Sequence, residues 1–221
     1  MIAKHIKIIN LRYLRYRHPL DMYPASFDRH KCIFFHIPKA AGTSVSLSLF
    51  GYQVGHLSFD QMYYSNPKKA SEYFKFTFVR NPWSRLVSAY QFLSAGGMNP
   101  TDKIWAENNL IKNEGFNEFV LRWVNDENIN SYIHFIPQYK FITDRNGVIR
   151  ADFVGKTENF QKDFEIISSE IGMKSTLLHS NKSNNSLNNK SYTAFYDNVS
   201  KEIVASVYQR DIELFGYKFD E

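Results

Sequence analysis

The fold is decided by two stretches: Lys31–Phe50, KCIFFHIPKAAGTSVSLSLF, and Phe74–Leu93, FKFTFVRNPWSRLVSAYQFL. In each, a run of apolar β-branched and aromatic residues leads into a polar turn and then into a helical pattern. Strands that alternate with helices predict an α/β domain of three layers, with a mainly parallel sheet between helices. Helix N-termini at the carboxyl ends of parallel strands attract anions. Because both turns carry cations and hydroxyls, the sequence predicts a ligand with two separate anionic ends.

The bulk composition describes a globular protein. Its 221 residues are enough for one sizeable core, and we expect a single domain over residues 1–221. Apolar residues make up 43% of the chain and aromatic residues 16%, which argues against disorder. The net charge of +5 suits an anionic ligand, although nucleic-acid binding would also produce it. The single cysteine, Cys32, excludes an intramolecular disulfide and fits a reducing compartment.

The amino end is basic and amphipathic. No stretch of the sequence approaches the ~20 apolar residues of a membrane span, and the first residues lack the apolar core of a signal peptide. Ile2, Ile6 and Ile9 recur at helical spacing, with lysines and arginines mostly elsewhere. We interpret residues 1–30 as an extension that either packs against its own domain or makes weak peripheral contact with an anionic membrane through residues 1–20. We expect a soluble protein.

Local signals predict the other elements. Ser58 and Gln61 form an S-x-x-Q capping box, and Asn81-Pro82 is typical of a helix N-cap followed by its first position. The turn at residues 144–147 ends in Asn-Gly and predicts a hairpin. Residues 179–191 have little to bury and predict a flexible polar loop. The predicted strands are Lys31–His36, Tyr52–His56, Phe74–Val79 and the hairpin arms Tyr139–Thr143 and Val148–Val154. Besides the helix from Ser58 toward Tyr64 and the helix from Asn81-Pro82 to Gly96-Gly97, the predicted helices are about Thr43–Phe50, 116–124, 160–171 and Val199–Phe215.

The first turn, His36–Ser44, has the chemistry of an anion cradle. Small side chains at Ala41 and Gly42 let main-chain N–H groups approach an anion, and the helix dipole adds attraction. Thr43 and Ser44 offer hydroxyls, and Lys39 supplies a mobile positive charge. The loop is not a Walker A motif, because Lys39 precedes Gly42 instead of following the second glycine of G-x-x-x-x-G-K-[ST]. The alternative is an ordinary turn before a capped helix.

The second turn supplies a guanidinium. Arg80 ends the strand, and Ser84, Arg85 and Ser88 share one face of the following helix with Asn81. Arg80 and Ser88 can therefore converge on one site, where a charge-assisted fork and a hydroxyl would clamp a phosphate. Arg85 lies on the same face and either joins that clamp or braces it. The alternative is a solvated polar face with a structural arginine.

Together these residues resemble the sulfotransferases that use 3′-phosphoadenosine 5′-phosphosulfate (PAPS), and most closely the carbohydrate-directed branch called sulfotransferase family 2. HIPKAAGTS resembles the loop for the 5′-phosphosulfate, and FVRNPWSRLVSAY the element for the 3′-phosphate. HFIPQYKFI, DFVGKTENF and DIELFGYKF are also similar, so that the resemblance covers about residues 31–219. It implies a P-loop nucleotide-kinase-like sulfotransferase fold, a parallel sheet flanked by helices.

The resemblance also implies roles by position. Arg80 and Ser88 would hold the 3′-phosphate. Lys182, in the polar loop, would either fold over the nucleotide, as late basic loops do in this superfamily, or stay solvated. The 5′-phosphosulfate would be cradled by Lys39, Ala41, Gly42, Thr43 and Ser44. Lys39 would also neutralise the charge that grows on the bridging oxygen during transfer.

Sulfuryl transfer needs a general base for the acceptor hydroxyl, and histidine suits neutral pH. We choose His56, because it ends a predicted strand beside the loop and lies where related enzymes are expected to carry their base. His134, Glu72 and Glu114 stay as alternatives. His36 directly precedes the loop and is better placed to brace it.

The function implied is a PAPS-dependent transfer to a hydroxyl of a carbohydrate or glycolipid, with no metal and no nucleic-acid partner. The acceptor is expected over Ala95–Ile136, where Trp105 and Trp123 either stack on sugar rings or fill the core. Eukaryotic members of the branch typically carry a membrane anchor, and this sequence begins without one, so we expect a bacterial cytoplasmic enzyme. The alternatives are a small-molecule or nucleotide kinase, which the absent G-K-[ST] argues against, and a non-enzymatic polyanion-binding protein. The acceptor and the oligomeric state stay open.

Overall fold

The structure, a computed structural model, describes residues 21–110, 115–173 and 191–220. Within these residues the sheet has three parallel strands in the order β1 (Cys32–Phe35), β2 (Phe74–Val79) and β3 (Phe153–Lys156). Phe76 of β2 pairs with Phe34 on one side and with Phe153 on the other, so all three carboxyl ends meet at one edge. The continuous apolar runs of β1 and β2 are buried, as is typical of parallel strands covered on both faces.

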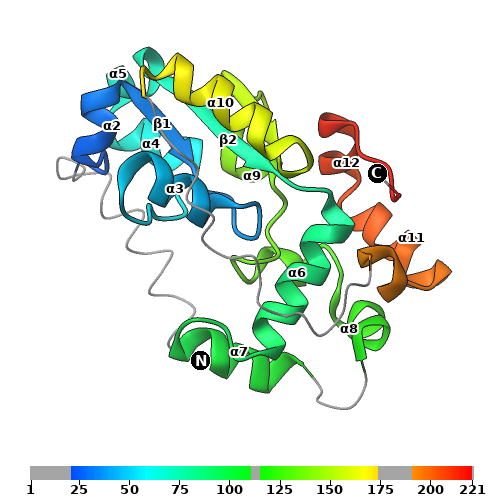
Figure 1. The fold of residues 1–221 in the computed structure, drawn as a ribbon. Coiled ribbons are helices and arrows are strands. Elements are labelled where there is room, and N and C mark those ends of the chain that lie inside the picture. Colours follow the sequence, from blue (N-terminus) through cyan, green and yellow to red (C-terminus); the bar gives the residue numbers. More distant parts are fainter. Residues whose placement is uncertain (1–20, 111–114, 174–190, 221) are drawn as a thin grey trace.

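Helices cover both faces of the sheet, which confirms the expected α/β architecture (Figure 1). Phe35 contacts Phe59 of α4 (Phe59–Ser65), whereas Phe78, which points to the opposite face, contacts Phe160 of α10 (Phe160–Glu170). The remaining helices around this core are α2 (Ala25–His30), α3 (Gly42–Phe50), α5 (Pro67–Glu72), α9 (Tyr139–Ile142) and α12 (Gln209–Phe215).

A second apolar cluster lies beside the sheet and is built around α6 (Pro82–Ser94). Its partners are α7 (Pro100–Asn109), α8 (Gly115–Trp123) and α11 (Asn198–Val207), as Figure 1 shows in the half of the molecule away from the sheet. Because α6 begins directly after β2, the two clusters meet at the carboxyl edge of the sheet. Short 3₁₀ turns complete the fold at Asn128–Asn130, Thr157–Asn159 and Tyr192–Phe195.

The predicted helix starts are confirmed. Asn81 Oδ1 accepts hydrogen bonds from the N–H groups of Trp83 (3.1 Å) and Ser84 (3.5 Å) at the start of α6. At the start of α4, the capping box of Ser58 and Gln61 is complete in both directions. Each of these side chains satisfies N–H groups that the helix itself cannot pair.

Two predicted strand assignments are wrong. Residues 52–56 form an irregular segment, whose Val54 carbonyl accepts from His36 Nδ1 at 2.8 Å instead of joining a ladder. The predicted hairpin is reduced to one antiparallel bridge between Thr143 and Ile149. Its first arm is the helix α9, because the N–H groups of residues 138 and 139 donate to the carboxylate of Asp211, each at 2.8 Å. The second arm continues into β3, which pairs in parallel with β2.

The last predicted helix is two helices. Its break lies at Tyr208, between α11 and α12, where the Tyr208 hydroxyl donates to the Phe135 carbonyl at 2.7 Å. In the described part of the chain, no helix has the length and apolar character needed to cross a bilayer. Residues 1–20 and nearly all of the predicted polar loop, including Lys182, lie outside the described residues.

Candidate active site

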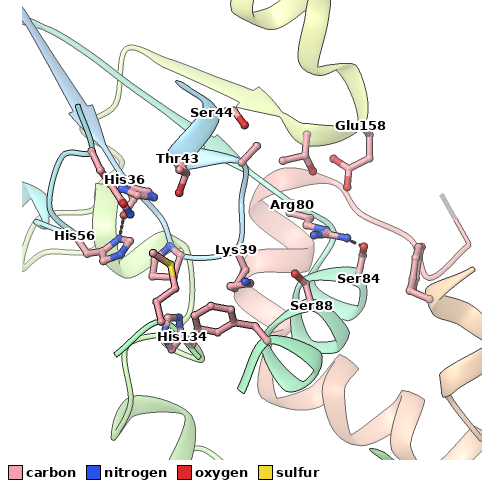
Figure 2. A pocket seen from close by; sticks show the side chains of 18 residues that line it. His36, Lys39, Thr43, Ser44, His56, Arg80, Ser84, Ser88, His134 and Glu158 are labelled. Carbon is pink, nitrogen blue, oxygen red and sulfur yellow. Dashed lines mark hydrogen bonds between the residues drawn. The ribbon is translucent and has the colours of Figure 1, made fainter. Parts of the chain in front are cut away.

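A cavity of about 510 Å³ opens at the edge where the three strands end (Figure 2). Every strand contributes to its wall through the segment that follows it: β1 through the loop to α3, β2 through Arg80 and α6, and β3 through Thr157 and Glu158. The described site residues that the sequence predicted all line this one cavity: Lys39, Ala41, Gly42, Thr43, Ser44, His56, Arg80 and Ser88.

The loop between β1 and α3 has an unusual backbone. Lys39 (φ 66°) and Ala41 (φ 59°) both adopt the left-handed conformation, which costs about 1–3 kcal/mol for each non-glycine residue. Ala41 is the N-cap of α3 and offers no side-chain cap. The first-turn N–H groups of α3 have no partners within the helix, and Gly42, Thr43 and Ser44 line the cavity. An anion at this point would satisfy those groups and meet the positive end of the helix dipole.

Gly42 is required by a close approach. A Cβ atom at this position would lie 1.9 Å from Cδ2 of His36, so only glycine lets α3 begin against that ring. The His36 side chain is buried, and its Nδ1 donates to the Val54 carbonyl. His36 therefore ties the loop to the segment that leads to His56.

Lys39 is a partly buried cation held over an aromatic ring. Its Nζ lies 3.8 Å from the ring centre of Phe92 on α6, a cation–π contact. Burial and the nearby charge of Arg80 lower the pKa of Lys39 to about 8. Neutral and protonated forms of Lys39 therefore lie close in free energy near pH 8, and a bound anion would favour the protonated form.

Arg80 and two serines form a second cationic wall. Arg80 Nε donates to Ser84 Oγ at 2.9 Å, which fixes the plane of the guanidinium, and Ser88 lies one turn further along α6. Burial lowers the pKa of Arg80, whereas the nearby Glu158 carboxylate opposes that shift. Glu158 accepts hydrogen bonds from the Asn81 N–H (2.9 Å) and the Tyr217 hydroxyl (3.0 Å). The cavity wall around Arg80 therefore carries both a positive and a negative charge.

His56 presents a defined tautomer to the cavity. Its Nδ1 lies 2.7 Å from the His36 carbonyl oxygen, and since a carbonyl only accepts, Nδ1 must carry the proton. The lone pair is then on Nε2, as a general base requires. Burial lowers the pKa of His56, so its neutral form dominates at neutral pH. Figure 2 shows His56 and Arg80 on opposite sides of Lys39.

The alternatives named from the sequence are placed less centrally, apart from His134, which lines the cavity. Arg85 is buried, and its guanidinium donates to the carbonyls of Pro38 (3.0 Å), Ile136 (2.8 Å) and His134 (3.3 Å), so it braces the site. Glu72 is exposed at the end of α5 and is not part of the cavity wall. Glu114 lies outside the described residues.

The two tryptophans belong to an aromatic cluster. Trp105 stacks on Tyr132 with ring centres 4.7 Å apart, and Trp123 stacks on Phe119 at 5.3 Å. Their rings also meet each other edge to face at 5.1 Å. Both are partly buried and pack against the α6 cluster, and neither lines the cavity.

Several wall residues were not predicted. The sequence predicts Ser84 only as a member of the polar face, although its position four residues, about one turn, after Arg80 makes it a natural partner of that guanidinium. Phe92 belongs to neither of the two anion sites that the sequence predicts. Glu158 follows β3 as Lys39 and Arg80 follow their strands, so the same strand-end signal would have found it. Because the sequence predicts residues 148–154 as a hairpin arm, it does not predict the parallel strand that ends just before Glu158.

Comparison with known proteins identifies a family that matches this chain. The family described as "Sulfotransferase family" matches residues 26–218. An "Uncharacterized protein" of Archaeoglobus fulgidus is 33% identical over 104 residues, which cover 46% of this chain and 69% of that protein. No solved structure matches the chain at a significant level.

Proposed function

The chain belongs to the sulfotransferase family, and from this premise we propose that it transfers the sulfuryl group of PAPS to a hydroxyl of a carbohydrate or glycolipid. The observation that carries the proposal is the pairing of two cationic walls in one cavity, Lys39 with the α3 N-terminus and Arg80 with two serines of α6. PAPS carries two separate anionic groups, a 3′-phosphate and a 5′-phosphosulfate, and this cavity offers one partner set for each.

The donor would bind across both walls. We infer that the loop from Lys39 to Ser44 acts as a P-loop-like cradle for the 5′-phosphosulfate, with main-chain N–H groups as donors. Arg80, oriented by Ser84, and Ser88 would hold the 3′-phosphate through charge-assisted hydrogen bonds. Lys182 would add a charge from the polar loop, in keeping with the resemblance.

The transfer would proceed by in-line displacement. The acceptor oxygen attacks sulfur, the bond from sulfur to the bridging phosphate oxygen breaks, and the acceptor proton passes to Nε2 of His56. Lys39 would neutralise the charge that develops on the departing phosphate oxygen. Positioning and charge stabilisation supply most of the rate, as in phosphoryl transfer, and the scheme uses no metal.

The acceptor class comes from the resemblance to the carbohydrate-directed branch. Of the region expected to hold the acceptor, Met98 and His134 reach the cavity wall. A carbohydrate or glycolipid would therefore approach between this region and His56. We also propose weak membrane contact through residues 1–20, which would bring a glycolipid within reach.

The nucleotide test compares calorimetric titrations of 3′-phosphoadenosine 5′-phosphate (PAP) and adenosine 5′-phosphate. Arg80→Ala should weaken PAP binding about 10- to 100-fold, the value of one or two charged hydrogen bonds, and leave adenosine 5′-phosphate binding nearly unchanged. Arg122→Ala, an exposed arginine on α8, is the matched control and should bind both ligands normally. Equal losses for both nucleotides in Arg80→Ala would contradict the assignment of the 3′-phosphate.

The activity test follows labelled sulfuryl from PAPS into a panel of unsulfated oligosaccharides and glycolipids. Transfer that the unmodified protein catalyses and that the His56→Gln variant has lost would support the proposal. Magnesium-dependent turnover of ATP in place of PAPS would point to a kinase on this scaffold. Salt-sensitive binding of generic polyanions without preference for PAP would point to a polyanion-binding protein.

A further inference from the structure

A network of three side chains, Asp102, Tyr132 and His134, supports the cavity wall at His134. Asp102, on α7, is 3% exposed, and its carboxylate accepts hydrogen bonds from the Tyr132 hydroxyl and from Nε2 of His134 (3.2 Å). The same carboxylate accepts from the Met98 N–H and from Nδ2 of Asn99, both at 3.0 Å. Of these groups, Met98 and His134 line the cavity. Four donors hold the carboxylate in a single orientation.

These bonds define the tautomer of His134. Burial raises the pKa of Asp102, but the hydrogen bonds, led by that from Tyr132, outweigh it and keep the carboxylate ionised. An ionised carboxylate only accepts, so the proton of His134 must be on Nε2 and the lone pair on Nδ1. Burial lowers the pKa of His134 to about 4, which keeps the imidazole neutral at physiological pH.

The lone pair on Nδ1 of His134 has no hydrogen-bond donor among the residues that the structure describes. The nitrogen itself is buried. Such an unpaired buried acceptor is unfavourable, and it is uncommon in native proteins unless a ligand or water pairs with it. Here it occurs in the wall of the candidate active site, in a ring held rigid by a buried carboxylate.

The position of His134 relates it to the reacting groups. Its ring lies 5.0 Å from the ring of Phe92, the same ring that carries Lys39 Nζ. Figure 2 shows His134 and His56 on the same side of Lys39, away from Arg80 and Ser88. Two neutral imidazoles, each with one unprotonated nitrogen, thus belong to the cavity wall on the side away from Arg80 and Ser88.

We propose that Nδ1 of His134 accepts a hydrogen bond from a second hydroxyl of the acceptor, next to the hydroxyl that His56 deprotonates. The inference rests on the proposed function and deepens it: the site selects a substrate with neighbouring hydroxyls, as on a sugar ring, over one with an isolated hydroxyl. A substrate without the second hydroxyl leaves the buried acceptor unpaired, which is how a site rejects a deoxy analogue. Asp102 and Tyr132 are positioning residues, which act through His134.

The first test reads the tautomer directly by ¹⁵N NMR of histidine-labelled protein, with His134→Gln to assign the resonance. We expect a protonated Nε2 and an unprotonated Nδ1 at neutral pH, and a shift toward the other tautomer in Asp102→Asn. A protonated Nδ1 in the unmodified protein would overturn the inference. The NMR result does not depend on PAPS. A failure of the proposed function would instead appear as an absence of PAP binding, so the two failures can be told apart.

The second test measures discrimination in transfer from PAPS to methyl glucoside and methyl galactoside and to their monodeoxy analogues. The His134→Gln variant keeps a donor to Asp102 but loses the Nδ1 acceptor. It should raise KM for the parent glycoside about tenfold and remove the preference over the deoxy analogue, with PAP affinity unchanged. His56→Gln, the matched control, should lower kcat for all acceptors.

Three results of this second test would contradict the inference. They are an equal loss for parent and deoxy sugars in His134→Gln, no preference between them in the unmodified enzyme, and no transfer to any of these glycosides.

Discussion

Lys39 combines two features that are unfavourable by themselves, a left-handed backbone and a partly buried ammonium group, whose pKa burial lowers. A cation–π contact with the ring of Phe92, worth about 0.5–2 kcal/mol, offsets part of the cost of desolvating the ammonium group. Strained and desolvated residues persist where function needs them. Lys39 lines the cavity between the histidines and Arg80 (Figure 2).

Lys39→Ala should lower kcat about 100-fold or more, because the ammonium matters most for the charge that grows in the transition state. PAP affinity should fall only a few-fold, since the main-chain cradle remains. Single-turnover kinetics and calorimetry measure the two effects. Lys103→Ala, an exposed position on α7, serves as control. Normal turnover in Lys39→Ala would remove this residue from the mechanism.

The pH dependence of kcat/KM should be bell-shaped and report the free enzyme. His56 acts as a base, so activity falls as pH drops through its pKa, which burial places below 6.5. Lys39 acts as a cation, so activity falls as pH rises through about 8, the value set by burial and Arg80. Saturating PAPS should move the alkaline limb upward, because the bound anion favours the ammonium. An alkaline limb that stays near the ordinary lysine value would contradict this assignment.

At the scale of elements, helix α3 begins differently from α4 and α6. α4 starts with a complete capping box, and α6 starts with Asn81 as its N-cap. α3 starts at Ala41 without any side-chain cap. The difference has a physical reason: a capping side chain would occupy the N–H groups that an anion needs. Helices α2, α9, α10 and α12 also begin without a side-chain cap, but of these described helix starts it is that of α3 that lines the cavity.

Gly42→Ala should disturb the start of α3, because the new Cβ would overlap the buried ring of His36. Overpacking of this kind costs about 1–3 kcal/mol, and here it also displaces the anion cradle. Urea denaturation should show the lower stability, and calorimetry a weaker affinity for PAP. Gly55→Ala is the matched control, since nothing lies within 4 Å of its added Cβ. Equal behaviour of the two variants would rule out the close approach as the reason for glycine.

At the scale of the whole molecule, Arg85 connects parts of the chain that are distant in sequence. From α6 it reaches the Pro38 carbonyl in the donor loop and the carbonyls of His134 and Ile136 on the other side. The side chain is 2% exposed, so its charge is compensated by these carbonyls and not by water. One buried guanidinium thus holds both halves of the cavity wall.

Arg85→Lys should destabilise the protein by about 2–4 kcal/mol, because a single ammonium cannot serve carbonyls placed for a planar fork and leaves some unpaired. PAP affinity should fall together with stability, as the donor loop loses its anchor. Urea denaturation and calorimetry on the same samples test both effects. Arg122→Lys, on the exposed surface of α8, should change neither. Full stability of Arg85→Lys would show that the three contacts contribute nothing.

The amino-acid sequence by itself determined the features that depend on neighbouring residues. The buried runs of β1 and β2, the cap at Asn81, the capping box at Ser58 and the two cationic turns are all local, and each was predicted correctly. These turns were also sufficient to predict that Lys39 and Arg80 converge, because parallel strands end at one edge.

Only the tertiary structure decided the features that depend on distant partners. β3 is a parallel strand because it pairs with β2 and its Gly155 admits Phe78, whereas the nearby Asn-Gly turn favoured a hairpin. Tyr139 begins a helix because Asp211, far along the chain, accepts its N–H. The network of Asp102, Tyr132 and His134 likewise joins residues up to 32 positions apart. Long-range hydrogen bonds and close packing leave no periodic pattern in a sequence, so they become visible only once the chain is folded.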